Sequence, residues 1–281
     1  MMHLPASPET LRLITFLSVF ALLALAEVIW PRRLLTVAKV QRWQANIGVI
    51  IADSLVVRLF APIAPITLAV TAQSKGWGLF NLFGIPGWLE LIAGLIIFDL
   101  IIYLQHRLFH RVPLLWRLHR MHHTDLDLDV STGTRFHPLE ISISLLIKMV
   151  AVLLFGLSPL TVLLFEILLN ATSMFNHANL ALPLPVDRWL RLLLVTPDMH
   201  RVHHSVIPKE TDSNFGFCQP WWDRLLGTYR EQPRDGHIGM TIGLREYRNQ
   251  DELGIWRLVR IPFEPQKTFE TQGAQRTQSK I

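Results

Sequence analysis

The sequence predicts an all-α fold, with several membrane-spanning helices and a helical cap at the cytoplasmic surface. Three observations support this prediction. Half of the 281 residues are hydrophobic, the apolar residues gather in long runs with few charges, and ten of the twelve histidines lie between His106 and His204. Ordinary soluble domains do not carry apolar runs of this length.

Residues 13–30 form the first apolar run, with Glu27 as its one charge. We expect a retained membrane anchor. A signal peptide is the alternative, because the sequence Ala-Leu-Ala at 24–26 resembles a cleavage site. Residues 1–11, however, contain no Lys or Arg, so the usual positive segment of a signal peptide is weak.

Two further apolar runs follow, and each predicts a membrane helix. Residues 47–72 are apolar apart from Asp53 and Arg58, and the prolines at 62 and 65 predict an irregular helix. Residues 88–105 carry only Glu90 and Asp99. A buried core helix is the alternative for residues 13–30 and for residues 47–72.

Residues 139–175 are predicted to form a membrane hairpin. Gly156, Ser158 and Pro159 break this long run near its middle. Each arm has about 18 residues, or roughly 27 Å at 1.5 Å per residue, which approaches the ~30 Å hydrocarbon thickness.

Basic residues predict the orientation. Arg32, Arg33, Lys39 and Arg42 follow the first run, whereas residues 73–87 contain only Lys75. Cytoplasmic loops are rich in Lys and Arg, so the 31–46 connection and the histidine region are expected in the cytoplasm, with Met1 outside. Cys218 is the only cysteine, which excludes an internal disulfide and a thiolate-ligated cluster. No motif for binding nucleic acid occurs.

The histidines form three clusters with helical spacing. Side chains three and four residues apart share a helix face, and neutral imidazole binds transition metals. Eight to ten imidazoles exceed what one ion can bind but suit two ions side by side. The sequence therefore predicts a dinuclear metal site in the cap. Its candidate ligands are His106, His110, His119, His122, His123, His137, His177, His200, His203 and His204.

Three polar residues are candidates to orient these ligands through hydrogen bonds. Asp99 stands seven residues, about two helical turns, before His106. Asp212 and Asn214 follow the last cluster and are expected to face His203 or His204. The alternative for Asp99 is a hydrogen bond at the helix end, and for the other two residues it is a turn.

The clusters, in the order HxxxH, HxxHH and HxxHH, together with the segment TDSNFGFCQPWWDRLLGTYR, resemble the fatty acid hydroxylase/sterol desaturase superfamily over roughly residues 85–232. His177 in FNHANL and His137 in RFHPLE match the additional ligands of that superfamily. The resemblance divides the chain into N-terminal transmembrane helices (1–84), a catalytic domain (85–235) containing the hairpin, and a polar C-terminal tail (236–281). Residues 265–281 are expected to be disordered.

The resemblance implies an integral membrane oxidoreductase of lipid metabolism with two iron ions, for which zinc can substitute in a preparation. It would use O2 to hydroxylate a fatty acyl, alkyl or sterol-like lipid, and a separate electron donor protein would be needed. Desaturation at the same site is the alternative. A membrane zinc hydrolase and a metal transporter are more distant alternatives. The hydrolase would need a glutamate motif such as HExxH, which is absent, and the transporter would bind ions within its spanning helices.

Overall fold

The computed structural model describes residues 7–60 and 64–265, and over these ranges the regular secondary structure is helical. The longer helices are α1 (Pro8–Ile29), α2 (Lys39–Leu59), α3 (Pro65–Lys75), α5 (Gly87–Arg111), α7 (Pro138–Phe155) and α8 (Pro159–His177). The shorter ones are α4 (Leu79–Leu82), α6 (Pro113–His119), α9 (Leu184–Leu190), α10 (Pro197–His203), α11 (Pro208–Thr211), α12 (Trp221–Leu225), α13 (Gly236–Gly239) and α14 (Ile255–Arg260). Short 3-10 turns are η2 (His122–Thr124), η3 (Thr132–Thr134), η4 (Gln250–Glu252) and η5 (Ile261–Phe263). The predicted all-α class is confirmed.

Four helices in the described ranges are long and apolar enough to cross a membrane: α1, α5, α7 and α8. The shortest, α7, has 18 residues and the longest, α5, has 25. At a rise of ~1.5 Å per residue these helices are roughly 27 to 38 Å long, which suits a bilayer core of ~30 Å. The chain is an integral membrane protein.

The second apolar run of the sequence forms two helices. α2 ends at Leu59, and α3 begins at Pro65, which suits the first turn of a helix because proline has no N–H to donate. α2 also carries two fully buried polar residues, Arg42 and Asn46. This run is therefore less uniform than the four candidate spans.

α7 and α8 form a hairpin with its turn at residues 156–158. Gly156 has a φ of +71°, which favours glycine, and Ser158 caps α8 by accepting a hydrogen bond from the Thr161 N–H. The carboxylate of Glu90 in α5 accepts from the Ser158 N–H and from the Thr161 hydroxyl, each at 2.9 Å. An acid inside an apolar run thus ties the hairpin turn to its neighbouring helix.

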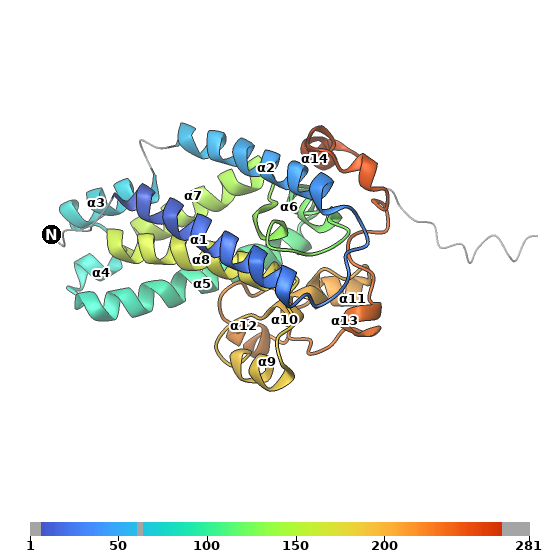
Figure 1. The fold of residues 1–281 in the computed structure, drawn as a ribbon. Helices are drawn as coiled ribbons and strands as arrows, with labels where there is room; N and C mark the ends of the chain where they lie inside the picture. Colours follow the sequence, from blue (N-terminus) through green and yellow to red (C-terminus); the bar gives the residue numbers. More distant parts are fainter. Residues whose placement is uncertain (1–6, 61–63, 266–281) are drawn as a thin grey trace, which may run out of the picture.

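The long helices alternate in direction, so the segments that carry the histidines gather at one end of the bundle (Figure 1). α3 and α4 lie at the opposite end. Pro31 and Leu180 form a bridge pair, and the Arg32 N–H donates to the carbonyl of Asn179 at 3.0 Å. The connection after α1 therefore lies beside the segment that follows α8, at the histidine end.

Residues 253–261, within the segment predicted as a polar C-terminal tail, pack against α2. Leu253, Leu258 and Ile261 are buried in one cluster with Ala45 and Val49 of α2. These apolar residues are few and irregularly spaced, so no helical period revealed them. Residues 266–281, which make up most of the segment predicted to be disordered, lie outside the described ranges.

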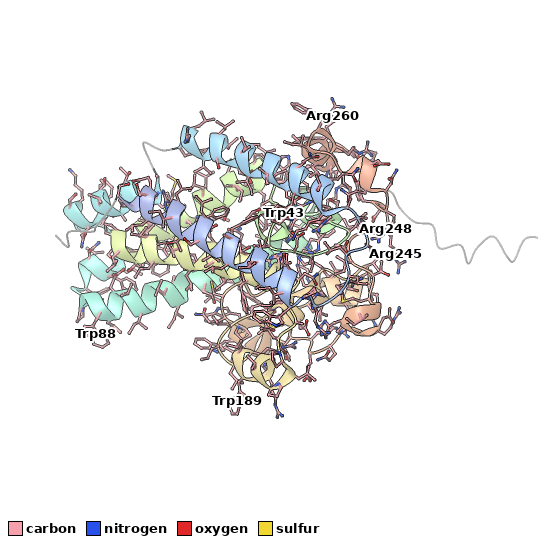
Figure 2. All side chains as sticks on the ribbon, in the orientation of Figure 1. Trp43, Trp88, Trp189, Arg245, Arg248 and Arg260 are labelled. Atoms are coloured by element: carbon pink, nitrogen blue, oxygen red, sulfur yellow. The ribbon has the colours of Figure 1, made fainter. Side chains whose placement is uncertain are left out.

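The two ends of the bundle carry different side chains. Arg245, Arg248 and Arg260 lie towards the histidine end, whereas Trp88 lies at the opposite end and is exposed (Figure 2). Tryptophans gather where a protein meets the membrane–water interface. The labelled arginines mark the histidine end, whereas exposed tryptophans occur at both ends, since Trp189 of α9 is exposed as well.

Candidate metal centre

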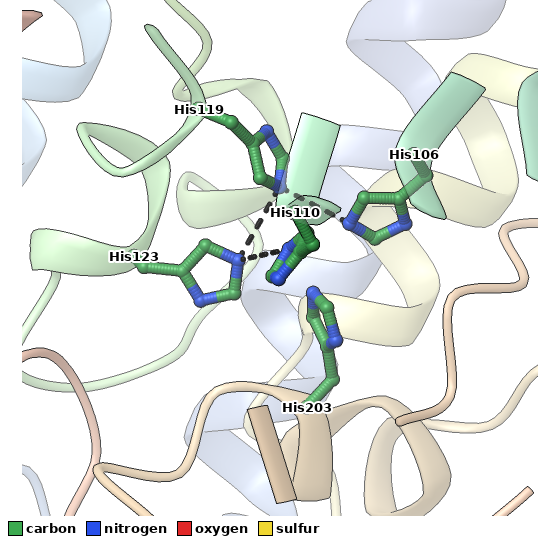
Figure 3. A group of neighbouring side chains, drawn as sticks. All are labelled: His106, His110, His119, His123 and His203. Carbon is green, nitrogen blue, oxygen red and sulfur yellow. Dashed lines mark hydrogen bonds between the residues drawn. The ribbon is translucent and has the colours of Figure 1, made fainter. Parts of the chain in front are cut away.

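Nine histidines in the described part of the chain form two neighbouring groups. The first group, drawn in Figure 3, contains His106, His110, His119, His123 and His203. The second contains His122, His177, His200 and His204. Within each group, one nitrogen of every residue lies within 4.8 Å of the others. Eight of the nine residues are buried as a whole, and His110, whose overall exposure is intermediate, has a side chain that is only 1% exposed.

Helix periodicity explains how short motifs serve both groups. His106 and His110 lie one turn apart on α5, and both join the first group. Each HxxHH motif, in contrast, contributes histidines to both groups. The first-group members are His119, His123 and His203, and the second-group members are His122, His200 and His204. The two groups are therefore neighbours, with the rings of His123 and His204 stacked at a centroid distance of 4.6 Å.

Six of these rings place Nδ1 beside an oxygen from the surrounding chain. The carbonyl acceptors are Phe215 for His106 (2.7 Å), Arg135 for His122 (3.1 Å), Ser173 for His177 (2.7 Å) and Ser213 for His203 (2.7 Å). The carboxylates are Glu140 for His119 (2.7 Å) and Asp212 for His110 (3.4 Å). An oxygen acceptor at Nδ1 requires the proton there, which leaves a lone pair on Nε2.

These lone pairs face one another. The Nε2 atoms of His106 and His119 are 3.1 Å apart, and those of His122 and His177 are 3.0 Å apart. Because each ring already donates through Nδ1, neither pair has a proton to share. Two nitrogens bound at ~2.1 Å to one ion, at angles of roughly 90–110°, lie about 3.0–3.4 Å apart. The spacing and the donor set therefore fit a metal ion in each group.

Burial favours the neutral form of the imidazoles of His203 and His200. Desolvation lowers the pKa of His203 from 6.5 to about 3 and lowers the pKa of His200 well below its ordinary value. The Nε2 of His203 and both ring nitrogens of His200 are buried without a hydrogen-bond partner in the described ranges. Neutral imidazoles with free lone pairs are the form that binds metal ions.

His137 lies outside both groups, contrary to the prediction from its sequence motif. Its Nδ1 accepts a hydrogen bond from the Leu139 N–H and caps α7, and its Nε2 lies 3.2 Å from the carbonyl oxygen of Val259. Both nitrogens are thus used by neighbouring backbone. His237, which the sequence analysis left out, is also outside both groups and lies 3.6 Å from Asp198.

Asp99 does not contact His106, so its predicted orienting role is wrong. Its carboxylate accepts from the indole N–H of Trp222 at 2.7 Å, whereas His106 donates to the carbonyl of Phe215. Seven residues return to nearly the same helix face but move ~10 Å along the axis. That separation is too large for a direct hydrogen bond.

Asp212 faces a different histidine from the predicted ones. It lies 3.4 Å from the Nδ1 of His110 rather than beside His203 or His204, and its side chain is half exposed. Burial raises the pKa of this carboxyl. The contact is longer and more exposed to solvent than that of Glu140 with His119.

Asn214 acts on the backbone and contacts no histidine directly. Its amide donates to the carbonyls of Met199 and Arg230, each at 2.8 Å, and its φ of +53° places it in the left-handed region. The preceding carbonyl, of Ser213, receives the Nδ1 proton of His203. Asn214 therefore fixes the turn that carries this acceptor. It is a turn residue, the alternative given from the sequence, and through the turn it also helps to orient His203.

Glu140 is a site residue that the sequence analysis missed. It is buried in the first turn of α7 and accepts from the Nδ1 of His119 at 2.7 Å. Carboxylates commonly hold metal-bound histidines in this way. A signal was present, because an acid within a predicted apolar hairpin needs a partner, and it stands three residues after His137.

A buried ionic network supports the loop that carries the acceptor of His122. The guanidinium of Arg42 donates to Asp125 at 2.6 and 2.9 Å and to Asp129 at 2.6 Å. Arg135, whose carbonyl faces the Nδ1 of His122, lies fully buried in the same region. Arg42 thus joins α2 to this loop, although its sequence position suggested only a cytoplasmic surface charge.

Comparison with known proteins supports the same centre. Residues 91–228 match the Fatty acid hydroxylase family. The chain is 30% identical over 245 residues to ornithine lipid hydroxylase OlsE of Rhizobium tropici, covering 81% of this chain and 70% of that protein. It is 29% identical over 185 residues to alkylglycerol monooxygenase of Homo sapiens, covering 62% and 39%, respectively. For cholesterol 25-hydroxylase of Homo sapiens the identity is 30% over 145 residues, covering 50% and 51%.

No solved structure matches the chain. The family match begins within α5 and ends after α12, so it contains all nine grouped histidines. The relatives are hydroxylases or monooxygenases of lipids by name. With its candidate spans and its paired histidine groups, the chain belongs to the fatty acid hydroxylase family of membrane enzymes.

Proposed function

We propose that this protein hydroxylates a membrane lipid with O2, using two iron ions held by the two histidine groups. The five histidines of the first group would hold one ion and the four of the second group the other. The observation that carries this proposal is the set of facing Nε2 lone pairs, 3.0 and 3.1 Å apart, whose protons are held on Nδ1. Such pairs repel each other unless a cation lies between them.

The choice of iron rests on chemistry. Oxidation of an unreactive C–H bond requires a metal that changes oxidation state, which zinc does not. Imidazole suits iron among other metals, so the ligands permit iron without requiring it. Bound iron would supply the activation of O2, and the family to which the chain belongs supports this choice.

The reaction balances as follows: a lipid C–H bond, one O2, two electrons and two protons give the alcohol and one water. One oxygen atom enters the lipid and the other leaves in water. The electrons would come from a separate carrier protein. Histidines that bind iron through Nε2 and donate through Nδ1 to a fixed oxygen would not supply these protons.

The apolar core of the bundle leads directly to the histidines. Phe217 belongs to the core cluster that contains Phe98 and Phe165 of the membrane helices, and Phe136 packs against that cluster. The rings of Phe217 and His106 are 5.0 Å apart. These aromatic rings thus border the centre on the side of the membrane helices and exclude water there. We propose a lipid of the acyl, alkyl or sterol type as the substrate.

The histidine end is proposed to face the cytoplasm. Arg32 and Arg33 follow α1 at this end, and Lys39 begins α2. The positive-inside rule applies best to short connections such as this one. A cysteine introduced at Lys75 should then react only with a reagent on the outer side.

The direct test is lipid analysis of cells with and without the protein under isotope-labelled O2. We expect a lipid that gains one labelled oxygen atom only in cells that make the protein. The matched control is the His204→Ala variant, which should insert but yield no product. A product that loses two hydrogens without gaining oxygen would instead assign desaturation.

A further inference from the structure

Trp116 lies between the first histidine group and the surface. The side chain of His110 is itself only 1% exposed, and the partly exposed residue Trp116 packs against it. The Trp116 ring lies 4.9 Å from that of His110, 5.5 Å from that of His123 and 6.4 Å from that of His119, measured between centroids. All three histidines belong to the first group. A conjugated side chain thus bridges this group and the surface.

The surface around Trp116 combines positive charge with an exposed apolar residue. Arg111 ends α5 and is exposed, and Leu114 is 70% exposed at the start of α6. Arg117, partly exposed, is held by a 2.7 Å hydrogen bond from its Nε to the carbonyl of Pro262. Asp212 is the acid near this surface and faces Arg111. Arginines around a hydrophobic centre are typical of protein interfaces.

We propose that Arg111, Leu114, Trp116 and Arg117 form the docking surface for an acidic one-electron carrier protein, and that electrons enter the first group through Trp116 and His110. This inference rests on the proposed function, which needs two electrons per turnover. Each docking event oxidises one reduced carrier by one electron, and two events supply the pair. The carrier's acidic surface would face the arginines.

Ring distances support entry at this face. Electron transfer slows steeply as the gap between donor and acceptor widens, so a carrier must dock where the centre is nearest to the surface. Trp116, which is partly exposed, lies within 4.9 to 6.4 Å of three first-group rings, measured between centroids. The stacked rings of His123 and His204, 4.6 Å apart, connect the two groups. Electrons delivered at Trp116 therefore have a short path to both.

Docking can be tested apart from catalysis. The full chain, loaded with redox-inactive zinc in phosphatidylcholine nanodiscs, would be titrated with a fluorescently labelled plant-type [2Fe–2S] ferredoxin as the acidic carrier. Reversal of a charge at an interface opposes complementary charges, so Arg111→Glu should raise the Kd about tenfold, and added salt should weaken the unmodified pair. Arg188→Glu on α9 is the matched control, since it makes the same charge change on an exposed residue that lies away from α6 (Figure 1).

Equal Kd values for Arg111→Glu and the unmodified chain would overturn the docking surface, and so would an equal loss in Arg188→Glu. Electron entry is tested by the anaerobic rate at which the iron-loaded protein oxidises reduced ferredoxin. Trp116→Leu should slow this rate and Trp116→Phe should largely restore it, while reduction by dithionite stays unchanged. Equal rates in all three proteins would exclude the path through Trp116. If docking holds but no lipid is oxidised, the proposed function fails and the docking surface stands.

Discussion

The two histidine groups are built from the same residue type but are held differently. In the first group, His119 and His110 face carboxylates, whereas His106 and His203 donate to backbone carbonyls. In the second, His122 and His177 donate to backbone carbonyls, and all four members are buried. The second group is thus fixed by backbone groups and has no spare ligand. The first has five ligands, two of which face side-chain carboxylates, and it contacts the partly exposed Trp116.

The comparison predicts its largest effect for loss of a ligand from the smaller group. His204→Ala leaves three histidines there, whereas His110→Ala leaves four in the first group. We expect His204→Ala to lose one metal ion per chain and all detectable hydroxylation. His110→Ala should keep more of its metal. Metal content and product formation measured on both variants check this, and equal metal loss would remove the distinction between the groups.

The next effect concerns the two carboxylates of the first group. Glu140→Gln removes the charged acceptor of His119, and loss of such a partner costs about 10- to 100-fold in metal affinity or activity. Asp212→Asn should cost less than about tenfold, because its contact with His110 is longer and half exposed. Competition with a chelator gives both affinities. A larger loss in Asp212→Asn would reverse the ranking.

Acid should destabilise the metal-free protein through both groups. The pKa of His203 falls from 6.5 to about 3 on folding, so between these values the unfolded chain holds a proton that the folded chain lacks. The free energy of unfolding therefore rises with pH across this window. Above about pH 6.5 this histidine no longer changes it, because neither state binds the proton. Tm of the chelator-treated protein in detergent should fall as the pH drops from about 7 to 5. His203→Ala and His200→Ala should each flatten that slope. An unchanged slope in both would contradict burial as its cause.

The smallest effect is expected at His137, which stands in neither group. Asn is also a good helix N-cap, so His137→Asn preserves the cap of α7 and removes the imidazole. Metal content and turnover should stay within about twofold of the unmodified protein. Loss of one metal ion in this variant would return His137 to the ligand set.

Helical spacing made most of the centre predictable. His106 and His110, four residues apart on α5, share a helix face and one group, as their spacing predicts, whereas the sequence did not show that His203 joins the other group from His200 and His204. Lone residues were harder to assign. His177 and His137 look alike in sequence, but His177 ends α8 at the centre whereas His137 begins α7 with both ring nitrogens beside backbone groups. Only the packing of the helices separates these two cases.

The hydrogen-bond partners of the ligand histidines could be predicted only where they lie close to the histidine in the sequence. Four of the Nδ1 acceptors are backbone carbonyls, which every residue offers, so no residue type marks them. Glu140 was visible as an acid in an apolar run but had no assigned partner. The folding of residues 253–261 onto α2 depends on long-range contacts of a few apolar side chains, which leave no periodic pattern.

The number of metal ions per chain tests the central claim most directly. The purified protein, produced with iron available, should be analysed by elemental mass spectrometry together with amino-acid quantification. Two groups whose lone pairs face inward predict two ions per chain, whichever metal occupies them, and about one in His204→Ala. A value of one or fewer in the unmodified protein would contradict the dinuclear centre.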